Sequence, residues 1–484
     1  MAKKENIIAA AVAAASLAAS GAVVECVRST DSEPWRPAHA VVADSASGEI
    51  ALEVADPSVK ADFDHPAFQA WGTTFNELDL DALRMLTESE RKEILDRAFL
   101  PDGELRFTRG RLTMNANDYS RAWYSCDEVD GDFDLKHFNI EHDKTNALIY
   151  VKWALARQPE MKFFVSPWSP PEWMKINHRY DVPRDESLYS DPSDSKCPDE
   201  QGWPPRLATR DGMIQDPRYL TAYAKMFTRF IDLYAAEGVT IDRVMYQNEA
   251  YSYVWYPGCA WTATATIRFN RDYLAPELKK SHPEVQLGLG TLNTNRRGYV
   301  RQMLDGLDGC CTILGLQWEG LQLAEDMRRE YKLPFFCTES ECGNGSMDWK
   351  AAEHTAWLIF ENLGKGAVEW YNWNLVLCDS GTSGWGWNQN ALVRVDSKTK
   401  TYRYNGEWQT VRHFARYIEP GAVLLGWSRW RDQTETIAYR NPDGTLVVVA
   451  GNWSERARKM SVRLGSRWVN FEMEPHSFET CVVR

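Results

Sequence analysis

Short apolar segments recur between residues 68 and 373, and most of them are separated by segments with a helical pattern. Apolar runs of this length, bounded by polar or turn residues, are typical of buried strands. Eight such segments lie at 68–75, 105–114, 161–166, 243–247, 285–289, 311–316, 334–339 and 367–373. Apolar residues at the 3.6-residue period predict helices between them, for example at 80–98, 219–236 and 351–363. Strands that alternate with helices eight times predict an α/β fold, a (β/α)8 TIM barrel.

The pattern changes after residue 420. Short segments with a strand pattern at 436–439, 446–450 and 478–483 are separated by turn residues and predict a small antiparallel β-sandwich attached to the barrel. A weak alternation at 49–54 predicts a strand outside the barrel that completes this sandwich. We therefore expect four parts, which are a leader at 1–28, a segment contributing sandwich strands at 29–66, the barrel at 67–418 and the C-terminal β-sandwich at 419–484.

The N-terminus has the pattern of a secretory signal peptide. Lys3 and Lys4 precede an alanine-rich apolar run at residues 7–24, and small residues at 19–22 within it suit cleavage. A run of 18 residues is near the shortest that can span a membrane, but alanine is weakly apolar, which favours export over anchoring. Cys26 invites a lipid anchor, although Glu25 stands where a small residue is expected. We expect a secreted or cell-envelope protein with no stable membrane span after leader cleavage.

Composition narrows the classes of partner. The net charge of −13 over 484 residues argues against nucleic acid, whose phosphates need clustered lysine and arginine. Tryptophan, with 21 residues, outnumbers phenylalanine, with 18, and flat aromatic rings suit the apolar faces of sugars as well as protein cores. Ten scattered cysteines without CxxC or HExxH motifs predict no metal, no cofactor and at most one or two disulfides.

Two of the predicted strands end in a carboxyl group. The run from Val244 ends at Asn248 and Glu249, and the run from Phe335 ends at Glu339, 90 residues later. If one strand and helix take about 30 residues, the second strand lies three positions further round the barrel, so the two carboxyl groups can face each other at its C-terminal end. Two carboxylates across one pocket are what glycosidic bond cleavage requires. The alternative is that each strand simply ends in a polar loop.

Two long insertions, 115–143 and 177–216, follow strands and are therefore expected at the same end of the barrel. Both are rich in aspartate, proline, tyrosine and tryptophan, which suits loops that form the walls of a pocket.

Four motifs resemble glycoside hydrolase family 30, the family of glucosylceramidases, β-1,6-glucanases and related β-glycosidases. They are the run Ser-Pro-Trp-Ser-Pro-Pro-Glu-Trp-Met-Lys at 166–175, Gln-Asn-Glu at 247–249, Thr-Glu at 338–339 and Trp-Asn-Leu at 373–375. The similarity extends from about residue 68 to the C-terminus, and the run at 166–175 is its most specific part. The resemblance implies a barrel with an attached β-sandwich and a retaining double displacement. It also implies that Glu249 is the acid/base, that Glu339 is the nucleophile and that Asn248 bonds the 2-hydroxyl of the sugar.

The same resemblance implies a set of substrate-binding residues: Arg111, Asp118, Trp168, Trp373 and Asn390. Asp118 and Trp168 resemble residues that hold the hydroxyls of a glucose ring. Arg111 is expected to orient the nucleophile through a charge-assisted bond, the alternative being a surface-loop arginine. At the end of the sixth strand, Gln317 and Trp318 are also assigned to substrate binding, where glucosylceramidases typically have His or Tyr. This departure favours a glucan or glucoside over a lipid-linked substrate.

Several alternatives remain at this stage. Glu341 lies two residues after Glu339 and competes for the role of nucleophile, although Glu339 directly follows the apolar run. We expect hydrolysis of β-1,6-glucan or a related β-glucoside, the alternatives within the family being glucosylceramide, β-xylan, β-xyloside or β-fucoside. The expected partner is thus a carbohydrate, either a β-glucan, a β-glucoside or the head group of a glycolipid. Outside the enzymes, a barrel that binds glycans without cleaving them is the remaining alternative.

Overall fold

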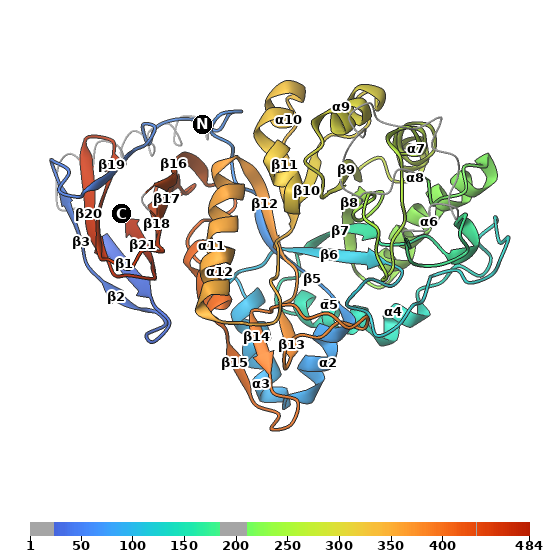
Figure 1. Ribbon diagram of the computed structural model, residues 1–484, viewed down its shortest axis with the longest axis horizontal. Coiled ribbons are helices and arrows are strands. Elements are labelled where there is room, and N and C mark those ends of the chain that lie inside the picture. Colours follow the sequence, from blue (N-terminus) through green and yellow to red (C-terminus); the bar gives the residue numbers. More distant parts are fainter. Residues whose placement is uncertain (1–23, 184–210, 432) are drawn as a thin grey trace, which may run out of the picture.

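The computed structural model describes residues 24–183, 211–431 and 433–484. It has two parts side by side, a barrel and a β-sandwich, with helices α11 (Trp349–Gly364) and α12 (Gly406–Ala415) lying between them (Figure 1). Residues 1–23 of the predicted leader and residues 184–210 of the second predicted insertion lie outside the described residues.

The predicted barrel is confirmed. Eight parallel strands form a closed sheet, and each overlaps one of the eight predicted segments. In chain order they are β5 (Ala70–Thr74), β6 (Arg109–Met114), β7 (Lys162–Pro167), β8 (Thr240–Met245), β9 (Gln286–Leu292), β10 (Leu314–Gln317), β11 (Phe335–Glu339) and β12 (Ala367–Asn372). Pairing of β12 with β5 closes the barrel, so every strand has two neighbours and no edge is exposed.

The helices around the barrel follow the sequence pattern. The longest, α6 (Pro217–Ala236), begins where the Asp216 side chain accepts a hydrogen bond from the Arg218 N–H, with proline at the first position. The other helical elements are α2 (Glu77–Met85), α3 (Glu88–Phe99), α4 (Glu141–Thr145), α5 (Ala147–Leu155), η1 (Glu172–Met174), α7 (Ala263–Phe269), η5 (Asn270–Leu274), α8 (Ala275–Ser281), α9 (Arg297–Gly306), η6 (Trp318–Leu323) and α10 (Ala324–Tyr331).

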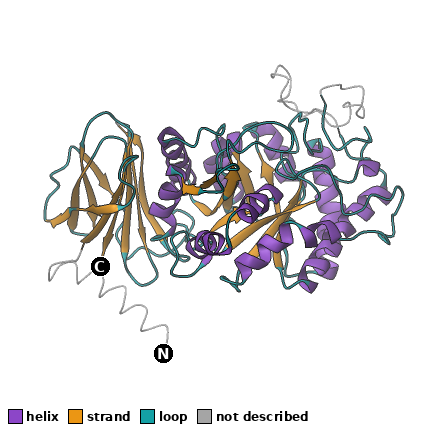
Figure 2. Cartoon of the chain, turned by 90° about the horizontal axis from the view of Figure 1, so that it is seen from below, coloured by secondary structure: helices purple, strands orange, loops and turns teal. Residues whose placement is uncertain are grey.

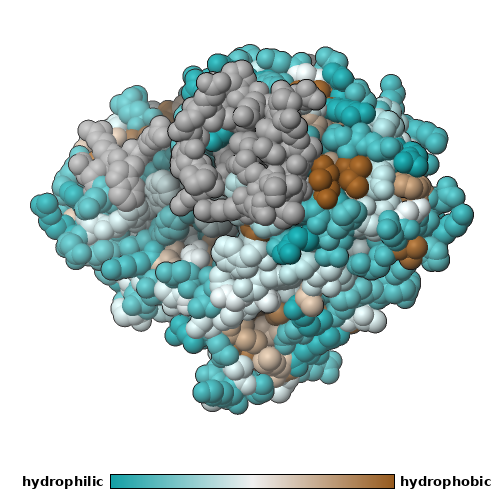
Figure 3. Space-filling view, turned by 45° about the vertical axis from the view of Figure 1, so that its right-hand side comes forward, coloured by the Kyte–Doolittle hydropathy of each residue, from teal (hydrophilic) through white to brown (hydrophobic). Residues whose placement is uncertain are grey.

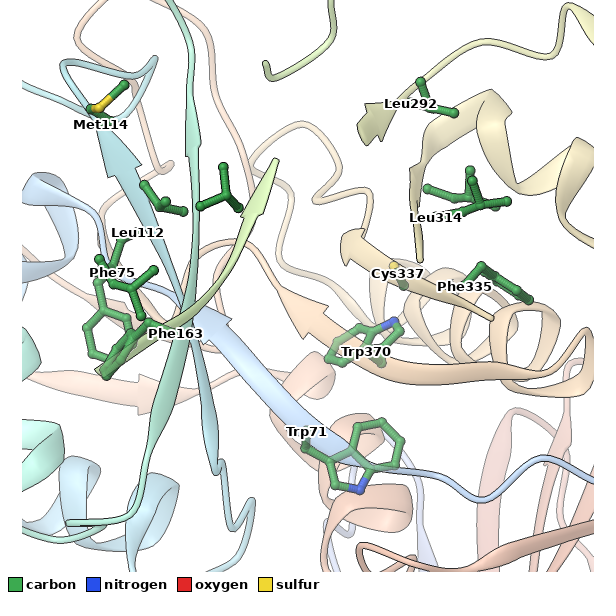
Figure 4. Close-up of a cluster of buried hydrophobic side chains, with 14 of the residues drawn as sticks. Trp71, Phe75, Leu112, Met114, Phe163, Leu292, Leu314, Phe335, Cys337 and Trp370 are labelled. Atoms are coloured by element: carbon green, nitrogen blue, oxygen red, sulfur yellow. The ribbon is translucent and has the colours of Figure 1, made fainter. Parts of the chain in front are cut away.

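Side chains on the two faces of the barrel strands form separate clusters. Those that face the helices include Trp71, Phe163 and Trp370, which join the main hydrophobic core (Figure 4). A smaller cluster consists of Phe164, Met245, Ile313, Phe336, Val368 and Tyr371. Five of its members lie on barrel strands and Ile313 directly precedes β10. They neighbour helix-facing residues such as Phe163 and Trp370, so they fill the interior of the barrel.

The β-sandwich is built from both ends of the chain, which are blue and red in Figure 1. Figure 2 shows it beside the helix-covered barrel. One sheet has the order β16-β17-β18-β21-β1-β2 and the other the order β3-β20-β19-β4. Their bounds are β1 (Val24–Ser29), β2 (Arg36–Ala38), β3 (Ala40–Ala43), β4 (Ile50–Glu53), β16 (Val423–Arg431), β17 (Thr434–Arg440), β18 (Leu446–Asn452), β19 (Arg458–Leu464), β20 (Arg467–Met473) and β21 (Ser477–Val483). The predicted sandwich is confirmed, and the leader predicted at 1–28 overlaps β1 over residues 24–28.

A disulfide joins Cys26 on β1 to Cys481 on β21, where the two residues lie opposite each other in the sheet. The sulfur of Cys26 is therefore used in this bond, which leaves no thiol there for a lipid anchor. The other described cysteines are free thiols.

Several elements were not predicted from the sequence. Three short strands, β13 (Val376–Cys378), β14 (Val393–Val395) and β15 (Tyr402–Tyr404), form a small sheet after the eighth barrel strand. Each has three residues, which is too short to show an alternating period. In the N-terminal segment, β2 contains Pro37, which weakens any strand signal.

Among the described residues, no helix combines the length and apolar character needed to cross a membrane. On the face shown in Figure 3, hydrophilic residues predominate and the hydrophobic ones form small separate spots.

Candidate active site

A cavity of about 830 Å³ opens at the C-terminal end of the barrel strands. Glu339 is the last residue of β11 and lies in its wall. Strand β8 ends at Met245, so Glu249 follows the strand by a short turn, in which its φ is +44° and its N–H is donated to the carbonyl of Thr291 at 3.3 Å. This turn brings Glu249 into the same cavity as Glu339, as the spacing of the two residues predicts.

The two carboxyl groups meet at one amide nitrogen. Nε2 of Gln317, the last residue of β10, donates to Oε1 of Glu249 at 3.0 Å and to Oε2 of Glu339 at 3.4 Å. One amide nitrogen thus bonds both acids, which places the two carboxyl groups in the same part of the cavity, as cleavage of one glycosidic bond requires. The Thr338 hydroxyl donates to Oε1 of Gln317 at 2.8 Å, so the amide is oriented with its nitrogen toward the acids.

Arg111 lies beneath the cavity and connects the strands that carry the site. Its guanidinium donates to Glu339 Oε2 at 2.7 Å, to Asn248 Oδ1 at 2.7 Å and to the Ser166 hydroxyl at 3.1 Å. The side chain is fully buried, and it lies 4.5 Å from the centroid of the Trp168 ring. The structure therefore places Arg111 in the core of the barrel, where it holds the Glu339 carboxylate, and not in a surface loop.

The surroundings of Glu249 and Glu339 favour different protonation states for the two acids. Burial and the nearby charge of Glu339 raise the pKa of Glu249 to about 7. Burial also raises the pKa of Glu339, but the bonded Arg111 guanidinium opposes this shift, as do the N–H groups of Trp318 and Gln317. Because Arg111 bonds Glu339 and not Glu249, Glu339 loses its proton first. Near neutral pH the pair therefore holds an ionised Glu339 beside a Glu249 that still binds a proton for much of the time.

Asn248 is fixed by its oxygen. Its Oδ1 accepts from Arg111 at 2.7 Å, from the Thr291 hydroxyl at 2.8 Å and from Gln317 Nε2 at 3.3 Å. With three donors on the oxygen, the amide nitrogen is directed away from this cluster, and the residue lines the cavity. Asn248 thus presents N–H donors to a molecule bound there.

Three other predicted residues also line the cavity: Asp118, Trp168 and Trp318. Burial and the charge of Glu339 raise the pKa of Asp118 well above its ordinary value. The Trp318 indole donates to Glu339 Oε1 at 3.2 Å. Carboxyl, amide and indole groups thus surround one end of the cavity and can bond the hydroxyls of a ring placed against Trp168.

Among the predicted residues, Arg111, Gln317, Trp373 and Asn390 do not line the cavity, and the first two bond the acids that do. Trp373 is buried and stacks on Trp168 with 5.3 Å between ring centroids, so it supports that ring from behind. Asn390 accepts the Gly345 N–H at 2.7 Å and donates to the buried Glu407 carboxyl at 2.7 Å. Asn390 therefore fixes the loop after β11, and direct contact of Trp373 or Asn390 with a ligand stays a prediction.

The competing acid, Glu341, lies beyond the end of β11 and does not line the cavity. Its Oε2 lies 3.0 Å from Nε2 of His354, on helix α11. A side chain held by this helix is not placed to react with a ligand beside Glu339.

Sequence reasoning missed much of the wall beside Glu249. Ser252 and Tyr256 each donate to Glu249 Oε2, at 3.4 and 3.5 Å, and Tyr256 packs against Trp387. The signal was present in the composition of the loops: tyrosine or tryptophan occupies positions 251, 253, 255 and 256, directly after Glu249, and positions 385 and 387. Such loops have no hydrophobic period, so a search for strand and helix patterns does not detect them.

Within the part of the chain that the structure describes, one group of three potential metal ligands lies close together, formed by Cys26, Glu479 and Cys481. Two of its members are bonded to each other as the disulfide, and the group lies in the β-sandwich. The groups in and beneath the cavity are carboxyl, amide, guanidinium and aromatic groups.

Comparisons with known proteins identify similar chains. The family model of the glycosyl hydrolase family 30 TIM-barrel domain matches residues 68–195, and that of the family 30 beta sandwich domain matches residues 421–481. Putative glucosylceramidase 1 from Caenorhabditis elegans is 24% identical over 454 residues, which cover 88% of this chain and 78% of that protein. An endo-1,6-beta-D-glucanase from Neurospora crassa is 24% identical over 420 residues, covering 79% and 78%. The crystal structure of SrfJ from Salmonella typhimurium has a TM-score of 0.79 at 18% identity and covers 95% of this chain and 99% of its own.

Proposed function

This chain belongs to glycosyl hydrolase family 30 and is a glycosidase, and from that premise we propose that it hydrolyses β-1,6-glucan with retention of configuration. The observation that carries this proposal is the contact of Glu249 and Glu339 with the same Gln317 nitrogen. Retaining enzymes hold their two carboxyl groups about 5 to 5.5 Å apart, so that one attacks while the other protonates.

The proposed reaction has two displacements. In the first, an oxygen of the Glu339 carboxylate forms a bond to the anomeric carbon while the bond to the glycosidic oxygen breaks. Glu249 donates its proton to that oxygen, and the leaving sugar departs as an alcohol. In the second, the Glu249 carboxylate takes a proton from water, the water oxygen bonds the anomeric carbon, and the bond to Glu339 breaks. Both residues then return to their starting protonation states.

The electrostatic environment of the two acids supports these roles. Glu249, with a pKa raised to about 7, retains a proton to donate near neutrality. Glu339 is kept ionised by Arg111 and remains available for attack. When the bond to Glu339 forms, its charge is lost, and the pKa of Glu249 falls, which suits its second role as a base.

We infer the sugar of the substrate from the groups that line the cavity near Glu339. Asp118, Asn248 and Trp168 line the cavity and offer the polar contacts and apolar face that a glucose ring requires. Gln317 and Trp318 stand where glucosylceramidases typically have His or Tyr, which favours a glucan. Among the relatives, the fungal one is an endo-1,6-beta-D-glucanase and the nematode one a putative glucosylceramidase, so glucosylceramide is the second candidate.

We also propose that the protein is exported. The leader pattern at residues 3–24 supports this, and so does the Cys26–Cys481 disulfide, because disulfides persist in oxidising compartments.

The substrate is tested by incubating the purified protein with β-1,6-linked gluco-oligosaccharides and, separately, with glucosylceramide dispersed in detergent. We expect the oligosaccharides to be hydrolysed with the higher kcat/KM, and proton NMR to detect the β-anomer of the new reducing end first. Formation of the α-anomer first contradicts retention, and a higher kcat/KM on glucosylceramide contradicts the choice of substrate.

The nucleophile is tested with an activated 2-fluoro-β-glucoside, which slows the release of the covalent intermediate. We expect peptide mass spectrometry to find one glucosyl label, on Glu339, because Arg111 and Trp318 hold this carboxylate in the cavity. The Glu341→Gln variant serves as a matched control and should be labelled to the same extent. A label on Glu341 in the unaltered protein contradicts the assignment.

The acid/base role of Glu249 is tested by the pH dependence of kcat/KM. Activity requires a protonated Glu249, so we expect kcat/KM to fall as the pH rises through about 7. Glu249→Gln should lower kcat/KM on the oligosaccharides by about 10²- to 10⁴-fold. With an activated aryl glucoside, this variant should lose the alkaline limb, whereas Glu341→Gln should keep it. Persistence of the limb in Glu249→Gln assigns it to another group and contradicts the role.

Export is tested by N-terminal sequencing of the protein recovered from the culture medium or cell envelope. We expect the mature chain to begin between about residues 20 and 24, because cleavage beyond this point would remove part of β1, which pairs with β21 from Val24 onward. A secreted chain that begins at Met1 contradicts the cleavage.

A further inference from the structure

The loop that follows Glu249 carries an exposed tryptophan at the mouth of the cavity. Trp255 is 59% exposed, and the other exposed large hydrophobic residues in the described part of the chain, Val41 and Val129, do not line the cavity. An indole exposed to this extent loses the stabilisation that burial provides. A ligand that covers Trp255 restores it.

Trp255 is held in place by its neighbours. Its ring lies 5.1 Å from that of Trp387 at an angle of 81° and 6.1 Å from that of Tyr256 at 73°. Its Nε1 donates to the carbonyl of Trp385 at 3.3 Å. Edge contacts and one hydrogen bond fix the indole, so little conformational entropy is lost when a ligand stacks on it.

This aromatic group lies on the side of Glu249. The Tyr256 hydroxyl donates to Glu249 Oε2 at 3.5 Å, and Tyr256 packs on Trp387 with 4.3 Å between ring centroids. Under the proposed reaction, Glu249 gives its proton to the glycosidic oxygen, so the leaving group must lie next to Glu249. Trp255, Tyr256 and Trp387 therefore border the space that the leaving group occupies.

The remaining groups at this end of the cavity are short and polar. Asn293, Thr294, Asn295 and Asn388 all line it, and they offer amide and hydroxyl groups beside the indole. A ligand with an apolar face and polar edges satisfies both kinds of group, which describes a sugar ring. One of these groups, Oδ1 of Asn293, is buried without a hydrogen-bond partner among the described residues, and an acyl chain would leave it so, at a cost in binding free energy.

We propose that Trp255, supported by Tyr256 and Trp387, is the surface on which the sugar of the leaving group stacks, so that the natural substrate is a carbohydrate chain and not a glycolipid. This inference rests on the proposed function and specifies the substrate on the leaving-group side of the same site. It makes Trp255 a residue that determines specificity and takes no part in bond breaking.

The test compares Trp255→Ala with the unaltered protein on two substrates. A β-1,6-linked gluco-oligosaccharide has a sugar as its leaving group, whereas β-glucosyl fluoride releases a fluoride ion that cannot stack. We expect Trp255→Ala to lose about tenfold more kcat/KM on the oligosaccharide than on the fluoride, because one aromatic contact contributes about that factor. Trp255→Phe, which keeps an aromatic face, should recover most of the loss. Trp357→Phe, an aromatic change on α11 away from the cavity, should leave both values unchanged.

The outcomes separate this inference from the proposed function. An equal loss on both substrates shows that Trp255 acts through the structure of the site, and it overturns the inference while leaving the glycosidase intact. A larger loss on glucosylceramide than on the oligosaccharide overturns it in favour of a lipid. If the unaltered protein hydrolyses the fluoride and no oligosaccharide, a sugar leaving group is excluded. If it hydrolyses neither, the proposed function fails first, and the inference fails with it.

Discussion

The site depends on one buried cation. The guanidinium of Arg111 has no exposure to solvent, and a charge in that position is stable only if it is paired and hydrogen-bonded. Glu339 supplies the opposite charge, while Asn248 and Ser166 accept hydrogen bonds from other N–H groups of Arg111. These partners lie at the ends of different strands or just beyond them. The free energy required to bury Arg111 therefore also fixes the positions of the carboxylate and the amide that face the cavity.

The same cavity contains more carboxyl groups than cations. Glu339, Glu249 and Asp118 share one cavity, and each of them lies within the electrostatic reach of a single guanidinium. Burial raises the pKa of all three carboxyl groups, and the guanidinium opposes this shift most directly at Glu339, to which it is hydrogen-bonded. Glu249 thus needs no dedicated proton donor to keep it protonated. Its burial and the charge of Glu339 make ionisation unfavourable, and this protonation state is a property of the coupled pair.

The barrel and the positions of the acids could be predicted because they depend on local periods. Apolar strands with the right spacing place Glu339 at a strand end and Glu249 just past another. The surroundings of other residues depend on contacts between distant parts of the chain. Asn390 bonds Glu407 and the loop at Gly345 instead of the cavity, and Glu341 is drawn away by His354 of a following helix. No pattern within a single segment contains that information.

The β-sandwich combines strands from both ends of the chain, and this has a consequence for the order in which the parts of the protein fold. Strand β1 lies between β2 and β21, and β3 and β4 flank the pair formed by β19 and β20. Synthesis proceeds from the N-terminus, so β1 cannot pair with β21 until the entire barrel has been translated. The barrel can fold as a unit during this interval, since domains generally fold as units. The sandwich is therefore the last part to assemble, and a chain that stops short of residue 477 leaves β1 without the strand that completes its sheet.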